Sequence, residues 1–191
     1  MNICIIGHGK SALNRKLGPR IDEFEVVRLK NPSWQNVEDY GTRCDYMAAS
    51  CETLPVMLEY KKVPKEYWGQ PKKGSWSKVT ESNFRSKAKA PLTVQIDLHN
   101  KWNPVFLGLT DNDLNVTPNH SLGMAAIVYS AELLKPEKIF LVGFDNMLNP
   151  DQLEYHKANV GKWVTRHDWH AEHKMLDIVR EELKVEIVGL G

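Results

Sequence analysis

The stretch that decides the fold is residues 3–11, Ile-Cys-Ile-Ile-Gly-His-Gly-Lys-Ser. Its apolar start, Ile3 to Ile6, is a short run that ends in glycine, which is typical of a buried parallel strand. Ser11 is placed to cap a helix that begins with residues 12–17. The Gly-x-Gly turn between them would let the backbone approach a phosphate, and the helix end would supply N–H donors.

Taken alone, this turn indicates nucleotide binding only weakly. It lacks the third glycine of the dinucleotide fingerprint, and the Walker spacing is absent. A plain tight turn is the alternative interpretation.

The rest of the chain alternates apolar strand and helix patterns. This alternation predicts a single α/β domain over residues 1–191, with a Rossmann-like, doubly wound, mostly parallel sheet. Residues 99–117 read as irregular, and the run KIFLVG at 138–143 is the clearest strand, expected to be central. We predict strands over 24–29, 45–49, 91–98, 138–143 and 185–188, and helices over 52–60, 123–134 and 171–183.

Residues 61–90 differ from the rest in charge. They hold nine lysines and arginines against Glu66 and Glu81, a net +7, whereas the whole chain carries +1. Trp68, Trp76 and Phe84 are interleaved with these cations. We expect a basic mobile loop or lid, which would suit an anionic acceptor, nucleic acid included, by charge and stacking. A solvated basic loop is the alternative.

Composition excludes several classes. Three cysteines, Cys4, Cys44 and Cys51, form neither a disulfide framework nor a CxxC zinc pair. No window approaches the roughly 20 apolar residues of a membrane helix, and the start shows no targeting pattern. We expect a soluble cytoplasmic protein.

The polar residues that could carry chemistry follow predicted strands or begin predicted helices. The carboxyl ends of parallel strands lie along one edge of a sheet, so one crevice could hold all of them. They are Gly7 to Ser11, Asn31, Ser121 to Gly123, Asp145 and His167.

Three segments together resemble the motifs of sialyltransferases. Residues 3–13 with 24–31 are similar to the large motif, an apolar strand, a glycine turn and an F-D-x-V-x-R-x-N segment. Residues 118–144 are similar to the small motif, with a proline, a Ser/Thr-Gly turn, a helix and a strand. His167 to Glu172 fits the H-x4-E pattern of the third motif. The three motifs occur in the family's order and cover about half the chain.

The resemblance implies a role for each matched residue. His167 corresponds to the general base that deprotonates the acceptor hydroxyl, and Glu172 to the glutamate expected to orient the site or the helix start. The remaining residues are expected to hold the donor nucleotide and its phosphate: Gly7, His8, Gly9, Lys10, Ser11, Asn31, Ser121, Gly123, Asp145 and Asn146.

The sequence departs from the family pattern at three places. His8 replaces the turn asparagine, extra residues spread the small motif, and Asn146 stands where an aromatic hydroxyl would meet the leaving phosphate. His120, Asn146 or a lysine of residues 61–90 would have to replace that donor.

The sequence therefore predicts a metal-independent, inverting glycosyltransferase with no cofactor. Its substrates would be a nucleotide sugar, CMP-linked by resemblance, and a glycan. Transfer to a hydroxylated base of nucleic acid is the second enzyme hypothesis. A non-catalytic nucleotide- or nucleic-acid-binding module is the third. His167, His170 and His173 could instead bind a metal, but a spacing of three drifts around a helix.

Overall fold

In the part of the chain that the structure describes, seven strands form one sheet, all parallel, in the order β5-β4-β3-β2-β1-β6-β7. The computed structural model describes residues 1–7, 9–29, 36–50, 62–71, 78–110, 120–145 and 168–190. The strands are β1 (Asn2–Ile6), β2 (Glu25–Leu29), β3 (Tyr46–Ser50), β4 (Glu66–Gln70), β5 (Leu92–Val94), β6 (Lys138–Val142) and β7 (Glu186–Gly189). The predicted fold class is confirmed.

The strand order contains one reversal. From β1 the chain steps outward to β5, then returns to place β6 on the other side of β1. Ligands of open α/β sheets bind at the carboxyl ends of the strands where the order reverses. The ends of β1 and β6 are therefore the expected location of a site. β6 lies between β1 and β7, so it is internal, but the middle strand of the seven is β2.

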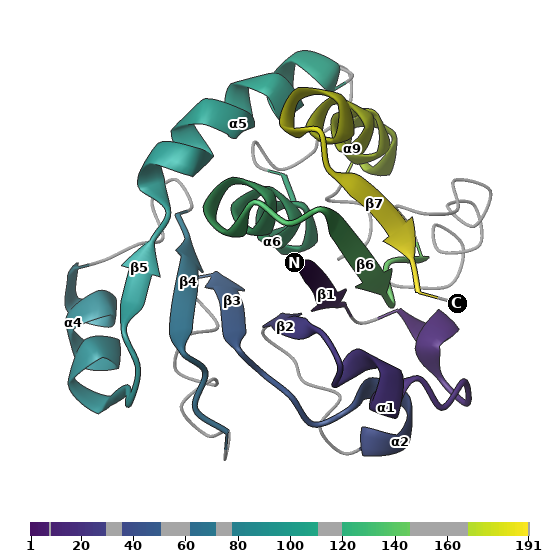
Figure 1. Ribbon diagram of the computed structural model, residues 1–191. Helices are drawn as coiled ribbons and strands as arrows, with labels where there is room; N and C mark the ends of the chain where they lie inside the picture. The colour runs from purple at the N-terminus through teal and green to yellow at the C-terminus, as the bar shows by residue number, and fades with distance from the viewer. Residues whose placement is uncertain are drawn as a thin grey trace.

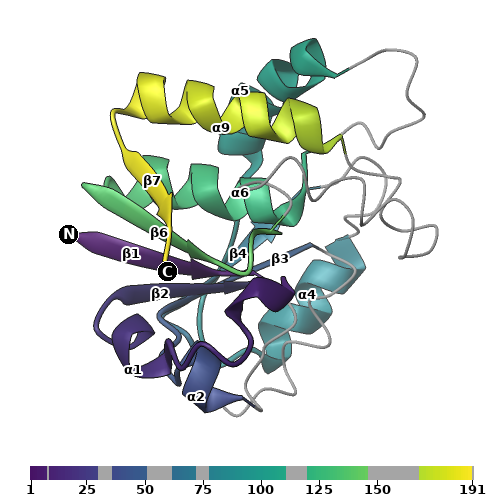
Figure 2. The ribbon, with the colours of Figure 1, turned by 90° about the vertical axis from the view of Figure 1, so that its right-hand side faces the viewer.

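Helices cover both faces of the sheet (Figures 1 and 2). α5 (Ile96–Leu109), α6 (Leu122–Tyr129) and α9 (Trp169–Leu183) lie on one face. α1 (Gly18–Ile21), α2 (Val37–Tyr40) and α4 (Lys78–Lys87) lie on the other. Alternate strand residues enter the two cores, with Ile3 and Ile5 under α6 and α9, and Cys4 and Ile6 facing α1. This alternation makes every residue of β1 after Asn2 buried.

α6 is buried all round, from Gly123 to Tyr129. It crosses β2 and β3, and a π-helical turn, η2 (Ser130–Leu134), extends it. The predicted helix over 123–134 is thus confirmed, as are those of α9 and the strand β6. Burial on every side is what an apolar helix without an amphipathic pattern requires.

The predicted helix after Ser11 is wrong. Only a 3₁₀ turn, η1 (Lys10–Ala12), follows the glycines. Asn14 and Lys16 adopt left-handed backbone angles, φ 61° and 54°, which a helix does not allow. Their N–H groups donate to the Asp39 carboxylate at 2.7 and 2.8 Å, so a carboxylate from α2 replaces helical hydrogen bonding.

Two further predictions are corrected. The strand expected over 91–98 ends at Val94, and α5 occupies part of the segment expected to be irregular. Pro104 lies inside α5 although proline disfavours helix interiors. Trp102 and Phe106, one turn apart, are both buried, and this packing stabilises the helix.

The basic segment 61–90, expected to be a loop, contains β4 and α4 within its described residues. Trp68 and Phe84, two of the three aromatics considered for stacking on nucleic acid, are buried. Lys65 and Arg85 form ion pairs with carboxylates of this chain. These residues are therefore committed to the fold.

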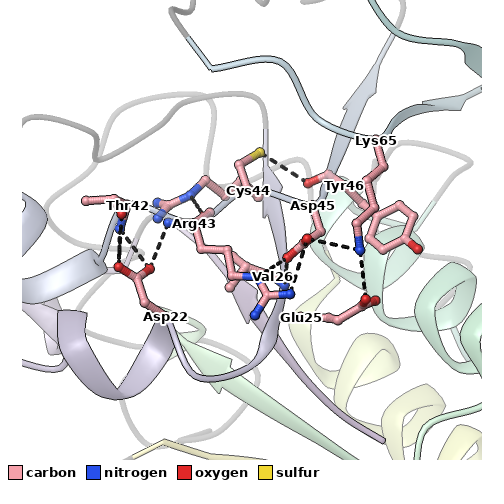
Figure 3. Close-up of polar contacts among 10 residues, drawn as sticks. Asp22, Glu25, Val26, Thr42, Arg43, Cys44, Asp45, Tyr46 and Lys65 are labelled. Carbon is pink, nitrogen blue, oxygen red and sulfur yellow. Dashed lines mark hydrogen bonds and ion pairs between the residues drawn. The ribbon is translucent and has the colours of Figure 1, made fainter.

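Charged side chains hold the amino ends of β2, β3 and β4 together (Figure 3). Asp45, which precedes β3, accepts from Arg43 Nε at 2.6 Å and lies 3.1 Å from the Lys65 ammonium. Lys65 also contacts Glu25 at 2.8 Å. Asp22 accepts from the Arg43 N–H at 2.7 Å. This network is at the edge opposite the strand ends that carry the candidate residues.

Among the helices of the described residues, none is both long and apolar enough to cross a membrane.

Candidate active site

The glycine turn after β1 is bonded directly to the end of β6. Gly7 N donates to the Val142 carbonyl and Gly9 N to the Gly143 carbonyl, each at 2.8 Å. Gly143 has φ +69°, a backbone conformation that side chains disfavour. The turn after β1 and the turn after β6 thus meet where the strand order reverses. Their backbones are so close that side chains would not fit at these glycines.

Asp145 completes this contact. Its carboxylate accepts hydrogen bonds from the Ser11 N–H, at 3.2 Å, and from the Ser11 hydroxyl. A Cβ added to Gly9 would overlap that carboxylate. Tyr40 donates its hydroxyl to the Gly9 carbonyl at 3.2 Å. Two of the donors predicted to face a phosphate, those of Ser11, are therefore engaged by a carboxylate of the chain itself.

This close approach predicts that Gly9→Ala lowers the free energy of unfolding by about 1–3 kcal/mol, because the new methyl must displace Asp145 from Ser11. Urea denaturation measures it. Gly108→Ala is the matched control, since a Cβ there meets nothing within 4 Å and the site is in helix α5. It should be neutral or stabilise by up to about 1 kcal/mol. Equal stability of Gly9→Ala and the wild type would contradict this account of the turn.

Ser121 and Glu172 join the starts of α6 and α9. Glu172 is fully buried. Its carboxylate accepts from the Ser121 N–H at 2.5 Å and from the Ser121 hydroxyl at 2.7 Å. Ser121 is also the N-cap of α6, because its hydroxyl oxygen accepts from Met124 N at 3.1 Å. The hydroxyl thus both donates and accepts, so its hydrogen-bonding capacity is largely used inside the protein.

Burial raises the pKa of Glu172 to about 7, against the lowering effect of the two Ser121 hydrogen bonds, and the nearby Asp168 carboxylate raises the pKa further. Asp168 caps α9 by accepting from Ala171 N at 3.0 Å. Glu172 is therefore a carboxyl group that titrates near neutral pH while it connects two helix starts. It faces Ser121 rather than open solvent.

Comparison with solved structures identifies this architecture. The sialyltransferase CstII from Campylobacter jejuni, in complex with cytidine-5'-monophosphate, matches with a TM-score of 0.63 and 14% identity. The match covers 99% of this chain and 79% of that chain. The fold is that of sialyltransferases.

Two further structures have the same fold. An α-2,3-sialyltransferase from C. jejuni in apo form gives a TM-score of 0.61 at 17% identity, over 99% of this chain and 74% of that one. A mammalian sialyltransferase in complex with Gal-beta-1-3GalNAc-ortho-nitrophenol gives 0.59 at 17%, over 97% and 68%. No protein-family model matches the sequence, and no curated protein matches it.

The structure gathers the described site residues into two clusters. Gly7, Gly9, Ser11 and Asp145 form the first, at the ends of β1 and β6. Ser121, Gly123 and Glu172 belong to the second, at the starts of α6 and α9. Four of the predicted site residues lie outside the described residues: His8, Asn31, Asn146 and His167. The side chain of Lys10 also lies outside them.

Sequence reasoning gave no role to some residues that organise this region. Arg28, the arginine of the large-motif segment, is buried and donates to the carbonyls of Arg43 and Tyr40 at 2.8 Å each. It holds the chain between β2 and β3. Gln70, at the end of β4, donates to the His120 carbonyl at 2.9 Å. A charged residue inside an apolar strand pattern was the available signal for Arg28, whereas Gln70 carried no such signal because β4 is not an apolar run.

Within the part of the chain that the structure describes, no three His, Cys, Asp or Glu side chains gather as metal ligands.

Proposed function

We propose that this protein is a glycosyltransferase that moves a sugar from a nucleotide-activated donor to an acceptor hydroxyl. The observation that carries the proposal is the Ser121–Glu172 contact. It joins the segments that resemble the small and third motifs, through two hydrogen bonds between buried residues 51 apart in sequence. The large-motif turn meets the end of the small motif at Gly143 and Asp145. Segments that resemble the family's motifs, although far apart in the sequence, are thus hydrogen-bonded to one another on a sialyltransferase fold.

In the proposed mechanism His167 is the general base. A histidine with a pKa near 6.5 is largely neutral at working pH and can take the acceptor proton as its oxygen attacks the anomeric carbon. One displacement with one base inverts that carbon. Asp168, the residue that follows His167 in the sequence, is the N-cap of α9. Backbone N–H groups and neutral side chains would stabilise the leaving phosphate, without a metal.

We propose CMP as the nucleotide and a glycan as the acceptor. Of the solved relatives, CstII was crystallised with cytidine-5'-monophosphate and, in another structure, with a trisaccharide acceptor and CMP. The nucleic-acid alternatives lose support because Trp68 and Phe84 are in the core and Lys65 is paired.

Nucleotide binding is expected to appear as selective thermal stabilisation. CMP at a hundredfold excess over its Kd should add about 2.7 kcal/mol, which raises the Tm of a chain of this size by about 5–10 °C. UDP and GDP at the same concentration should raise the Tm by less than about 2 °C, which corresponds to less than about 1 kcal/mol of stabilisation. Asn31→Ala, at the expected nucleotide contact, should lose the CMP shift. If all three nucleotides shift the Tm equally, or none does, the proposed donor is wrong.

A further inference from the structure

The two edges of the sheet differ in how their outward backbone groups are used. The edge strands are β5 and β7 (Figure 1). On β7, Glu186 N and Leu190 N donate toward β6, so the backbone groups of Ile187 point outward by the two-residue alternation of a strand. The Arg180 guanidinium, from α9, donates to the Ile187 carbonyl from Nε at 3.2 Å and from Nη2 at 2.7 Å. A side chain therefore covers the outward carbonyl of this edge.

The edge at β5 has no such cover. The Pro91 carbonyl and the Gln95 N–H form hydrogen bonds with β4, at 2.8 and 2.9 Å. Because the backbone alternates in direction along a strand, the N–H and C=O groups of Leu92 and Val94 point outward. In the part of the chain that the structure describes, no residue forms a hydrogen bond with these four groups. The edge of β5 therefore offers two donors and two acceptors to another strand.

We propose that β5 pairs with β5 of a second copy of this chain, antiparallel and related by a twofold axis at Thr93. In this register Leu92 of one copy lies opposite Val94 of the other, and each such pair exchanges two hydrogen bonds. All the outward groups of both strands are then used. Thr93, whose side chain is exposed, lies opposite the same residue of the second copy, and two threonines form a favourable cross-strand pair.

The charges that flank β5 favour the antiparallel arrangement. Lys87 and Lys89 precede the strand, and Asp97 follows it in the first turn of α5. All three side chains are exposed. Antiparallel pairing brings the segment before β5 in one copy next to the segment after β5 in the other, so the lysines approach an aspartate twice. Ile96, which is 52% exposed, also follows the strand, and the partner's flank would cover it. The edge is therefore complementary to itself.

Arg180 opposes the other way of extending the sheet. Pairing of β5 in one copy with β7 in the next is a head-to-tail contact, which builds an open filament unless it closes into a ring. The arginine occupies the Ile187 carbonyl that this pairing needs. Association is thus directed to a closed dimer, in which the two β5 strands run in opposite directions and the two candidate sites open on opposite sides. The inference is independent of the proposed glycosyl transfer.

The first test is sedimentation velocity of the full chain from about 10 µM to about 1 mM. A single short strand gives a small interface, so we expect a dimer with a Kd of about 100 µM. The sedimenting mass should rise toward twice the mass of one chain and no further. A chain that stays monomeric at about 1 mM, tenfold above this Kd, overturns the proposal, as do assemblies that keep growing beyond a dimer.

A cysteine at the twofold axis tests both the edge and its register. Opposite residues of a non-hydrogen-bonded antiparallel pair lie about 4.5 Å apart between Cα atoms, which a disulfide can span. Thr93→Cys should therefore form a covalent dimer under mild oxidation. The wild type should not, nor should Lys174→Cys, at an exposed position on α9. A dimer that Thr93→Cys fails to cross-link would use another surface, and the proposal would be wrong.

Exchange of charges gives a second readout that needs no new covalent bond. Lys89→Asp and Asp97→Lys should each weaken the dimer about tenfold, because like charges then approach one another. The double variant should return the Kd to within about threefold of the wild type. Lys174→Asp, the same change of charge on α9, should leave the Kd within about twofold. An unchanged Kd in both single variants, or no recovery in the double variant, would contradict the antiparallel arrangement.

Discussion

Replacing His167 by alanine is expected to slow glycosyl transfer by about 10²–10⁴-fold, the range that a general base contributes. The acceptor hydroxyl must lose its proton as it attacks, and alanine cannot take it. Binding of the donor should be unaffected, so the loss should be seen in kcat. Rates are measured as nucleotide release in the presence of acceptor.

The control for this variant is His170→Ala. His170 lies three residues later, on the exposed side of α9, and has the same side chain. Its removal should change kcat by less than about twofold, well below the effect of a base. Full transfer by His167→Ala, or equal losses in both variants, would remove His167 from the mechanism. EDTA should not change the wild-type rate.

Glu172→Gln is expected to change how stability depends on pH. Folding raises the pKa of Glu172 from 4.5 to about 7, mainly because the carboxylate is buried. Between these values the folded protein binds a proton that the unfolded chain does not. Protonation of Glu172 therefore adds to the free energy of unfolding. This contribution is complete below pH 4.5 and is lost as pH rises through about 7. A shift of this size is on the order of 3 kcal/mol.

Glutamine has no proton to lose, so this dependence should disappear. The stability of Glu172→Gln relative to the wild type should therefore increase by on the order of 3 kcal/mol between pH 4.5 and pH 8, measured by urea denaturation. Glu181→Gln, an exposed position on the same helix, should follow the wild-type curve within about 0.5 kcal/mol. Parallel curves for Glu172→Gln and the wild type would show that Glu172 does not titrate in this range.

The sheet was predictable because its strands are nearly continuous apolar runs. Ile3 to Ile6 and residues 138–143 have the pattern that burial on both faces demands. β4 was missed because Glu66, Gly69 and Gln70 interrupt its apolar residues. The true reason for its strand conformation is pairing with β3 and β5, a non-local interaction that the local pattern does not contain.

The site was predictable where motif residues serve the fold as well as chemistry. Gly9 was found as a glycine needed for a close approach, but the group that approaches is Asp145 rather than a phosphate. Glu172 was found through the H-x4-E pattern, yet only the structure gives its partner, Ser121. The partners of a buried carboxylate depend on packing between helices, which one sequence does not specify. Gln70 was not considered for the same reason.

The central claim is that this chain transfers a sugar from a nucleotide donor. The most direct measurement is mass spectrometry of Gal-beta-1-3GalNAc-ortho-nitrophenol after incubation with CMP-sialic acid and EDTA, with the wild type and with His167→Ala. The account predicts one added sialic acid with the wild type and little or none with the variant. If no CMP-, UDP- or GDP-sugar adds mass to this or any other glycan acceptor while the protein remains folded, the account is contradicted.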